Sequence, residues 1–334
     1  MERIALFERG IDSTPVELLS GEYGPDRFFM KRDDMVPFSF GGNKARKAAE
    51  FYKEIAGGDT DVVMTYGSSS SNHCRIIANM AAAMGLSCHI ISPEDTSQEG
   101  KWEPFYNARL AGLFGATVEK CPLSLVAETI ERRKLAYERE GRKPYFIAGG
   151  GHGNPGTEGY VKAYREILAY EKENQVYFDY IFHPSGTGTT QAGLVCGKLL
   201  SGDKGRKIIG ISIARQQERG REVVKDSIRE YLGARFDGLY GEEDLVFTDA
   251  YRLGGYGQYN EAVKKTIEEV LCREAIPMDT TYVGKAFYGM CQYVEERGIR
   301  GKNILFIHTG GTPLFFDFIS KHFGAVGGFQ GKQT

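Results

Sequence analysis

The sequence predicts an α/β protein of two domains or one large domain, built from parallel-rich sheets that are covered by helices. Short β-rich runs alternate with longer helical patterns along the chain, which is typical of βα units. The candidate strands are short and apolar on both sides, as strands covered on two faces require. The length of 334 residues allows two domains of ordinary size.

The alternation defines the predicted elements in chain order. The expected strands span 28–32, 62–66, 88–92, 117–120, 145–148, 177–182, 207–213, 246–249 and 304–307. The expected helices span 45–52, 72–84, 123–139, 160–173, 191–200, 219–232, 260–273, 284–297 and 313–323, where apolar residues recur at helical spacing. No internal repeat or low-complexity tract interrupts this order.

The charge balance argues against two classes of partner. The chain has 42 Lys and Arg against 44 Asp and Glu, which gives a net charge of −2. A nucleic-acid groove or a basic membrane face would need an excess of cations. The expected partner is therefore a small molecule.

The cysteines and histidines do not form a recognisable framework. None of the six cysteines forms a C-x-x-C pair, and no H-E-x-x-H occurs, so free buried thiols are expected and a protein-bound metal is not. The N-terminus lacks the apolar run of a signal peptide, and no transmembrane segment is evident. We therefore expect a cytoplasmic protein.

Glycine is over-represented, with 43 residues in the chain. At the usual frequency of roughly 7%, this leaves an excess of about 20 glycines that must reflect either disorder or backbone geometry. No linker-like tract accounts for them. The clusters fall instead where a predicted strand passes into a predicted helix.

The clearest cluster follows the predicted strand 177–182. It reads Ser185, Gly186, Thr187, Gly188, Thr189 and Thr190, and a helix follows. Glycines allow close backbone approach to an anion, and free N–H groups at the helix N-terminus donate to it. This pattern favours a phosphate-binding loop over an ordinary turn. It is not a Walker A loop, and the G-x-G-x-x-G at 151–156 is too weak alone to indicate a dinucleotide site.

Lys44 is the second signal. It follows Gly41, Gly42 and Asn43, where a helical pattern begins. The positive end of a helix dipole disfavours an ammonium there, and a neutral lysine can form a Schiff base with a carbonyl cofactor. A solvated surface lysine is the alternative that its sequence position alone leaves open.

Two further turns carry polar groups. The segment 65–82 contains a strand, four serines and a helix start near Ser71 and Asn72, which suits a helix cap and a carboxylate site. The segment 306–313 is a strand that ends in Thr309 and two glycines. Each of these alone is also compatible with a simple strand–helix turn.

Together these segments resemble the D-cysteine desulfhydrase and 1-aminocyclopropane-1-carboxylate (ACC) deaminase family. These are pyridoxal-phosphate (PLP) enzymes of the tryptophan-synthase-β fold, called fold type II. The matching segments occur in the right order over most of the chain. They are K-R-D-D with G-G-N-K-A-R-K at 31–47, S-N-H-C-R at 71–75, the loop 185–193, G-Y-G at 255–257, Y-V-G-K to Gly289, and H-T-G-G at 308–311.

The resemblance implies roles for individual residues. Lys44 would carry PLP, residues 185–190 would hold its phosphate, Asn72 would bind the ring 3′-oxygen, and Thr309 would face the pyridine nitrogen. Ser71, Asn72 and His73 would receive the substrate carboxylate, and Tyr256 and Tyr282 would flank the reacting carbons. Ser71 and the two tyrosines join Lys44 as expected catalytic residues.

The resemblance also implies an assembly. It suggests a larger PLP-binding domain made of 1–47 and 158–334, and a smaller α/β domain of 48–157. A homodimer would be usual.

Three departures from the family pattern concern the substrate. Val283 stands where the ACC deaminase branch has an acidic residue, and Ser70 replaces a glutamine. The loop 149–160 is longer, so His152 and Glu158 are candidates for contacts with a substrate side chain, and exposed loop residues are the alternative. Thr309 is the residue of the D-cysteine desulfhydrase branch.

The expected activity is thus a PLP-dependent lyase that acts on a small amino acid by β-elimination. The products would be a keto acid, ammonia and the released β-substituent. The alternatives are β-replacement, in which a nucleophile adds to the same intermediate, an ACC deaminase-like reaction, and a PLP-binding protein without catalysis.

Overall fold

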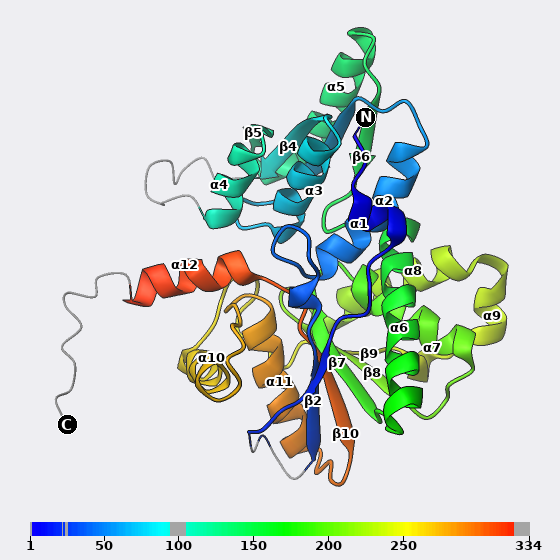
Figure 1. Ribbon diagram of the computed structural model, residues 1–334, viewed down its shortest axis with the longest axis vertical. Helices are drawn as coiled ribbons and strands as arrows, with labels where there is room; N and C mark the ends of the chain where they lie inside the picture. The colour runs from blue at the N-terminus through cyan, green and yellow to red at the C-terminus, as the bar shows by residue number, and fades with distance from the viewer. Residues whose placement is uncertain (1, 22, 24–25, 94–104, 324–334) are drawn as a thin grey trace.

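The strands form two separate sheets in the computed structural model, which describes residues 2–21, 23, 26–93 and 105–323 (Figure 1). The larger sheet has the order β1 (Val16–Leu18), β2 (Arg27–Lys31), β10 (Asn303–Ile307), β7 (Tyr180–Ser185), β8 (Lys207–Ser212) and β9 (Val246–Thr248). The smaller sheet has the order β5 (Thr117–Cys121), β4 (Ser87–Pro93), β3 (Val62–Tyr66) and β6 (Pro144–Ile147). Among these described strands, β1 and β2 pair antiparallel and all other neighbours are parallel. The predicted parallel-rich α/β class is confirmed.

Helices cover both faces of the larger sheet. One face packs against α10 (Glu261–Glu274), α11 (Val283–Glu296) and α12 (Thr312–Phe323), and the other against α6 (Asn154–Asn174), α7 (Thr189–Ser201), α8 (Gln217–Leu232) and α9 (Phe236–Leu239). Strand alternation produces this division: Phe28 and Met30 belong to the first core, whereas Phe29 belongs to the second.

The smaller sheet is covered in the same way. Its first face packs against α1 (Ala5–Arg9), α2 (Asn43–Ala56), α3 (Asn72–Ala83) and α4 (Tyr106–Leu113), and its second against α5 (Val126–Arg139). All of its strands come from residues 62–147, and the larger sheet takes its strands from the chain on either side. The exact domain boundaries at 47/48 and 157/158 remain a prediction. Within the described residues, no helix has both the length and the apolarity that crossing a membrane requires.

The elements agree with the expected ones except at a few places. β7 begins three residues later than predicted, because Phe178 does not join the ladder and its N–H and C=O bind the side chains of Glu171 and Arg206. α6 begins at Asn154 and not at Tyr160, because Pro155 occupies its first turn and Gly153, with φ of 120°, precedes it. β1, α1, α4 and α9 carry too few patterned residues to be found from periodicity.

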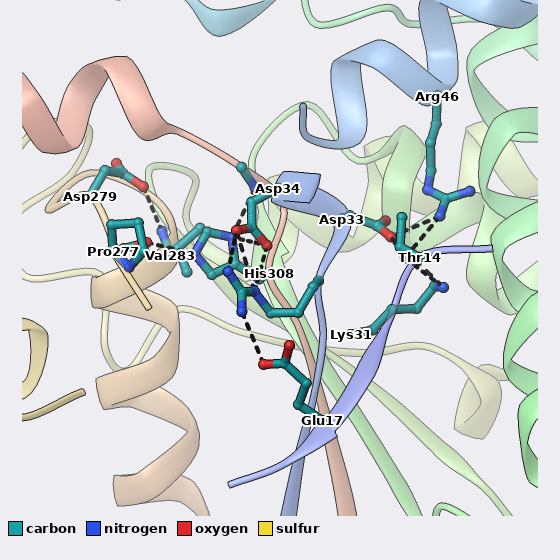
Figure 2. A network of polar contacts seen from close by, with 12 residues as sticks. Thr14, Glu17, Lys31, Asp33, Asp34, Arg46, Pro277, Asp279, Val283 and His308 are labelled. Carbon is teal, nitrogen blue, oxygen red and sulfur yellow. Dashed lines mark hydrogen bonds and ion pairs between the residues drawn. The ribbon is translucent and has the colours of Figure 1, made fainter. Parts of the chain in front are cut away.

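A buried ionic network joins the start of α2 to the larger sheet, where Arg46, Asp33, Thr14 and Lys31 meet (Figure 2). It also joins α2 to α6 through Glu166. Asp33 is 0% exposed and accepts hydrogen bonds from Thr14 Oγ1 at 2.8 Å, Arg46 Nη2 at 2.9 Å and Tyr160 OH at 2.7 Å. Glu166 on α6 completes the network, because it pairs with Arg46 at 2.6 Å and with Lys31 at 2.8 Å. The pKa of the Asp33 carboxyl is lowered by Arg46 and Lys31, although burial opposes this.

We expect Asp33→Ala to lower the free energy of unfolding by about 3–5 kcal/mol, because it leaves a buried arginine short of an acceptor and takes a counter-charge from both Arg46 and Lys31. Equilibrium urea denaturation measures the change. Glu17→Ala is the control, since Glu17 is 43% exposed and pairs with Arg32 at the surface. Its effect should stay below about 1 kcal/mol. Equal losses in the two variants would contradict the structural role of the network.

Candidate active site

One cavity of about 350 Å³ lies where loops from both sheets meet. Its walls come from loops at the carboxyl ends of β3, β6, β7, β8 and β10, together with the first residues of α2 and α3. Ligands of parallel α/β sheets bind at such ends. Most of the expected site residues line it: Lys44, Ser71, Asn72, His73, Ser185, Gly186, Thr187, Gly188, Thr190, Tyr256, Tyr282 and Thr309.

Lys44 is the second residue of α2, and its side chain lines the cavity. Its Nζ donates a hydrogen bond to the carbonyl oxygen of Gly150 at 2.9 Å, and no described carboxylate lies within ion-pair distance of it. Burial lowers the pKa of this amine to about 8. A large fraction of Lys44 is therefore neutral and nucleophilic near pH 8.

Glycines bring the loop before Lys44 against the loop after β10. A Cβ on Gly42 would lie 2.6 Å from the carbonyl oxygen of Thr309, and a Cβ on Gly310 would lie 2.6 Å from the Cα of Gly42. The N–H of Asn43 donates to that same Thr309 oxygen at 3.0 Å. Thr309 and Lys44 are therefore held on neighbouring walls of the cavity by a backbone contact that side chains would prevent.

The expected phosphate loop has free donors. The N–H groups of Gly186, Thr187 and Gly188 donate to no backbone carbonyl in the described chain, and those of Thr189 and Thr190 open α7. Gly188 has φ of 98°, a conformation that favours glycine. The loop thus matches an anion such as a phosphate group in the chemistry of its donors.

Ser71 and Asn72 open α3. Ser71 is the N-cap residue, and its Oγ accepts the N–H of Cys74 at 3.2 Å. His73 also lines the cavity, but its Nε2 lies 2.9 Å from the hydroxyl of Thr65, which itself donates to Ile147 O. Because that hydroxyl has a single proton, His73 Nε2 is the donor. Burial holds the pKa of His73 well below its usual value, so the ring is neutral.

The two tyrosines form a pair. The hydroxyls of Tyr256 and Tyr282 lie 2.7 Å apart, and Ser70 Oγ lies 3.2 Å from the Tyr256 hydroxyl. Burial raises the pKa of Tyr282 well above its usual value, and the proximity of Tyr256 adds to the shift. Tyr282 is therefore a neutral proton donor at physiological pH.

His308 precedes Thr309 and does not line the cavity, and its imidazole lies beside Pro277 and Asp34 (Figure 2). Its Nδ1 accepts the N–H of Gly310 at 3.2 Å, and its Nε2 therefore donates to Pro277 O at 2.8 Å. Asp279 accepts the N–H groups of 281–283 and so fixes the start of α11, next to Tyr282. The sequence indicated His308 through the H-T-G-G segment but not its partners, and it gave no signal for Asp279.

Three of the expected contacts lie outside this cavity. His152 does not line it, and its Nδ1 lies 3.4 Å from Thr189 Oγ1. Thr189 is fully buried and contributes no wall. Glu158 belongs to α6 and accepts a hydrogen bond from Tyr231. The segment 149–160 was predicted to be one loop. The loop is shorter than that, because residues from Asn154 onward belong to α6.

Two cations in or beside the site were not predicted. Lys47 lies one turn after Lys44, and its Nζ contacts the same carbonyl of Gly150 at 3.4 Å. Burial and the proximity of Lys44 hold its pKa well below the usual value. Arg215 lines the cavity after β8 and donates to Gly186 O. Lys47 follows Lys44 at helical spacing in the sequence, whereas no sequence motif indicated Arg215.

Comparison with known proteins gives a consistent result. The model of the family described as "Pyridoxal-phosphate dependent enzyme" matches residues 7–310. A D-cysteine desulfhydrase of Yersinia enterocolitica is 34% identical over 92% of this chain and 94% of that protein. A putative 1-aminocyclopropane-1-carboxylate deaminase of Pyrococcus horikoshii is 34% identical over 92% of each chain.

Solved structures agree with this. The structure of an ACC deaminase homologue has a TM-score of 0.79 and 32% identity, and the match covers 92% of each chain. A bacterial threonine deaminase, with a TM-score of 0.66 and 18% identity over 91% of this chain and 94% of that one, shows the shared fold alone.

We expect Gly42→Ala to lower the free energy of unfolding by about 1–3 kcal/mol more than Gly85→Ala does, because only the first adds a clash in a packed site. Gly85 is the matched control, with φ of 68° and nothing within 4 Å of an added Cβ, whereas Gly42 has φ of 99° and meets Thr309. Urea denaturation of both variants measures the difference. Equal losses of unfolding free energy in the two variants would show that the loop at Gly42 is not tightly packed against the loop at Thr309.

Proposed function

Because the chain belongs to the pyridoxal-phosphate dependent enzyme family, we propose that it is a lyase which removes a β-substituent from a small amino acid. D-cysteine is the proposed substrate, and its products would be pyruvate, ammonia and sulfide. The observation that carries this proposal is the meeting of a partly neutral lysine, a tyrosine pair and a loop of free N–H donors around one cavity.

The residues present fit the cofactor. Lys44 would hold its carbonyl carbon, the loop 186–188 with the start of α7 would hold its phosphate, and Asn72 and Thr309 would contact the ring. When bound, PLP supplies an acceptor for the electrons that are released at the α-carbon of the substrate. A hydroxyl at Thr309, in place of a carboxylate, would leave the ring nitrogen without a negatively charged partner to hold a proton on it.

The protein groups would then carry the proton transfers. The Lys44 amine lines the same cavity in which the substrate would bind, and in its neutral form it would remove the α-proton. Tyr282, whose raised pKa keeps it protonated, would donate a proton to the departing group, with Tyr256 holding its hydroxyl at 2.7 Å. Ser71 and the N-terminus of α3 would bind the substrate carboxylate.

The absence of a carboxylate, both at position 283 and among the described lining residues, favours D-cysteine over ACC. The side chain of Val283 is fully buried in the core around α11 and does not line the cavity. The described lining residues include no Asp or Glu, so no carboxylate is in place to serve as a second acid or base.

The purified enzyme should release sulfide and pyruvate in equal amounts from D-cysteine, and we expect Tyr282→Phe to reduce the rate by about 10²–10⁴-fold because it removes the proton donor. Tyr288→Phe is the matched control, since Tyr288 packs against the core of the larger domain away from the cavity. A new amino acid formed in place of pyruvate when thiols are added would establish β-replacement. No turnover and no cofactor in the purified protein would overturn the proposal.

The pKa of Lys44 gives a pH dependence. We expect the rate at which the apoenzyme takes up PLP to rise with pH up to about 8 and then level off, because the neutral amine is the reacting form. An ordinary lysine would give a rise that continues to about pH 10.4. Stopped-flow absorption at a series of pH values measures this rate. A rate that continues to rise well above pH 8, as for an ordinary lysine, would contradict the lowered pKa.

We further propose that the enzyme works as a cytoplasmic homodimer. All six cysteines are free, which suits a reducing compartment. Analytical ultracentrifugation of the holoenzyme would distinguish a dimer from a monomer.

A further inference from the structure

Arg75 is a buried cation without a carboxylate partner among the described residues. Its side chain is 0% exposed, and it donates to Asn107 Oδ1 at 2.8 Å, Ser39 Oγ at 3.0 Å and Asn72 Oδ1 at 3.4 Å. Burial lowers its pKa to about 9. The other fully buried arginine, Arg206, is paired with Glu171 at 2.6 Å. An uncompensated buried charge costs stability, so this arrangement calls for an explanation.

The arginine fixes the orientation of two amides in turn. Because a guanidinium only donates, the atom of Asn107 that faces Arg75 must be its oxygen. The amino group of Asn107 therefore donates, to Ser70 O at 2.8 Å and to Asn72 Oδ1 at 2.9 Å. Asn72 Oδ1 thus receives two donors, which leaves its amino group as the end that is free to face the cavity.

The charge of Arg75 and the orientation of the Asn72 amide both favour the binding of an anion. The N-terminus of α3, the amino group of Asn72 and the charge of Arg75 behind it all favour an anionic oxygen in this corner of the cavity. No Asp or Glu among the described lining residues opposes them. Arg75 also binds Ser39, in the loop that leads to Lys44, so it connects the carboxylate corner to the lysine.

We propose that Arg75 and Asn107 are positioning residues that set the affinity of the site for the substrate carboxylate. They do so by turning the amino group of Asn72 toward the cavity, where its two N–H groups can serve the cofactor ring and the substrate carboxylate, and by leaving one positive charge unpaired behind it. The inference rests on the proposed function, because it assumes that an amino acid binds beside Lys44.

Asn107→Asp tests this with little change in shape. The new carboxylate would pair with Arg75 and neutralise its charge, and it would repel Asn72 Oδ1, so that the Asn72 amide would turn its oxygen toward the cavity. Asn174→Asp is the matched control, because Asn174 is the last residue of α6 and its side chain bonds only Tyr170 O among the described residues. Asn107→Ala, which removes the same bonds without adding charge, is the second variant.

The measurement compares two amines that cannot undergo β-elimination. The holoenzymes are titrated with D-alanine, which has a carboxylate, and with ethylamine, which does not, and the change in visible absorption is followed. We expect the half-saturation of D-alanine to rise about 10- to 100-fold in Asn107→Asp, the size of a lost hydrogen bond to a charged group, with ethylamine changed less than about 3-fold. Asn107→Ala should shift in the same direction, and Asn174→Asp should match the parent.

Several results would overturn the inference. They are an unchanged half-saturation for D-alanine in either Asn107 variant, an equal change for both amines, and a parent enzyme that binds ethylamine as tightly as D-alanine. A loss of PLP affinity with an unchanged ratio of the two amines would place the effect of Asn72 on the cofactor, and would also overturn it. The proposed function fails separately, if the parent protein shows no visible absorption before any amine is added.

Discussion

The enclosure of the Lys44 amine against a carbonyl, with no described carboxylate beside it, is the constraint on which the site depends. A carboxylate at this point would hold the ammonium in its charged form and end its use as a nucleophile. The carboxylates that bind α2 through Arg46 are themselves paired, because Asp33 contacts Arg46 and Glu166 contacts both Arg46 and Lys31. The network therefore anchors the helix that carries Lys44 and contributes no carboxylate to an ion pair with the Lys44 amine.

The glycine excess has a geometric explanation. Gly41, Gly42, Gly150, Gly188 and Gly310 all have positive φ and belong to the loops around the cavity. Several of them also lie where a Cβ would overlap another loop, as at Gly42 and Gly310. The glycines therefore allow segments from two sheets to converge on one small volume, and disorder is not needed to account for them.

Much of the fold was predictable, because strands buried on both faces and amphipathic helices carry strong periodic signals. The family, its cofactor and its fold are confirmed by comparison, and most of the expected site residues line one cavity. The interpretation of 149–160 as a single loop was wrong, since a proline in the first turn of a helix resembles a turn signal in sequence. Because of that error, His152 and Glu158 were expected to contact the substrate. In the structure, His152 lies beside Thr189, and Glu158 accepts a hydrogen bond from Tyr231.

The residues that support the site from behind, such as Asn107 and Lys47, could not have been predicted from sequence periodicity or from the resemblance. Asn107 lies on a short helix with no clear pattern, and its contact with Arg75 joins positions 32 residues apart. Lys44 and Lys47 contact the same carbonyl, that of Gly150, because the chain after β6 folds back over α2. Such contacts depend on how distant loops meet in space, and local sequence contains little information about that.

We propose that Lys44, and not its neighbour Lys47, carries the cofactor. Reduction of the holoenzyme with borohydride, followed by proteolysis and mass spectrometry of the peptides, tests it directly. The account requires the phosphopyridoxyl group on Lys44 alone, and its absence when Lys44 is replaced by alanine. The same group on Lys47, or on neither lysine, would contradict it.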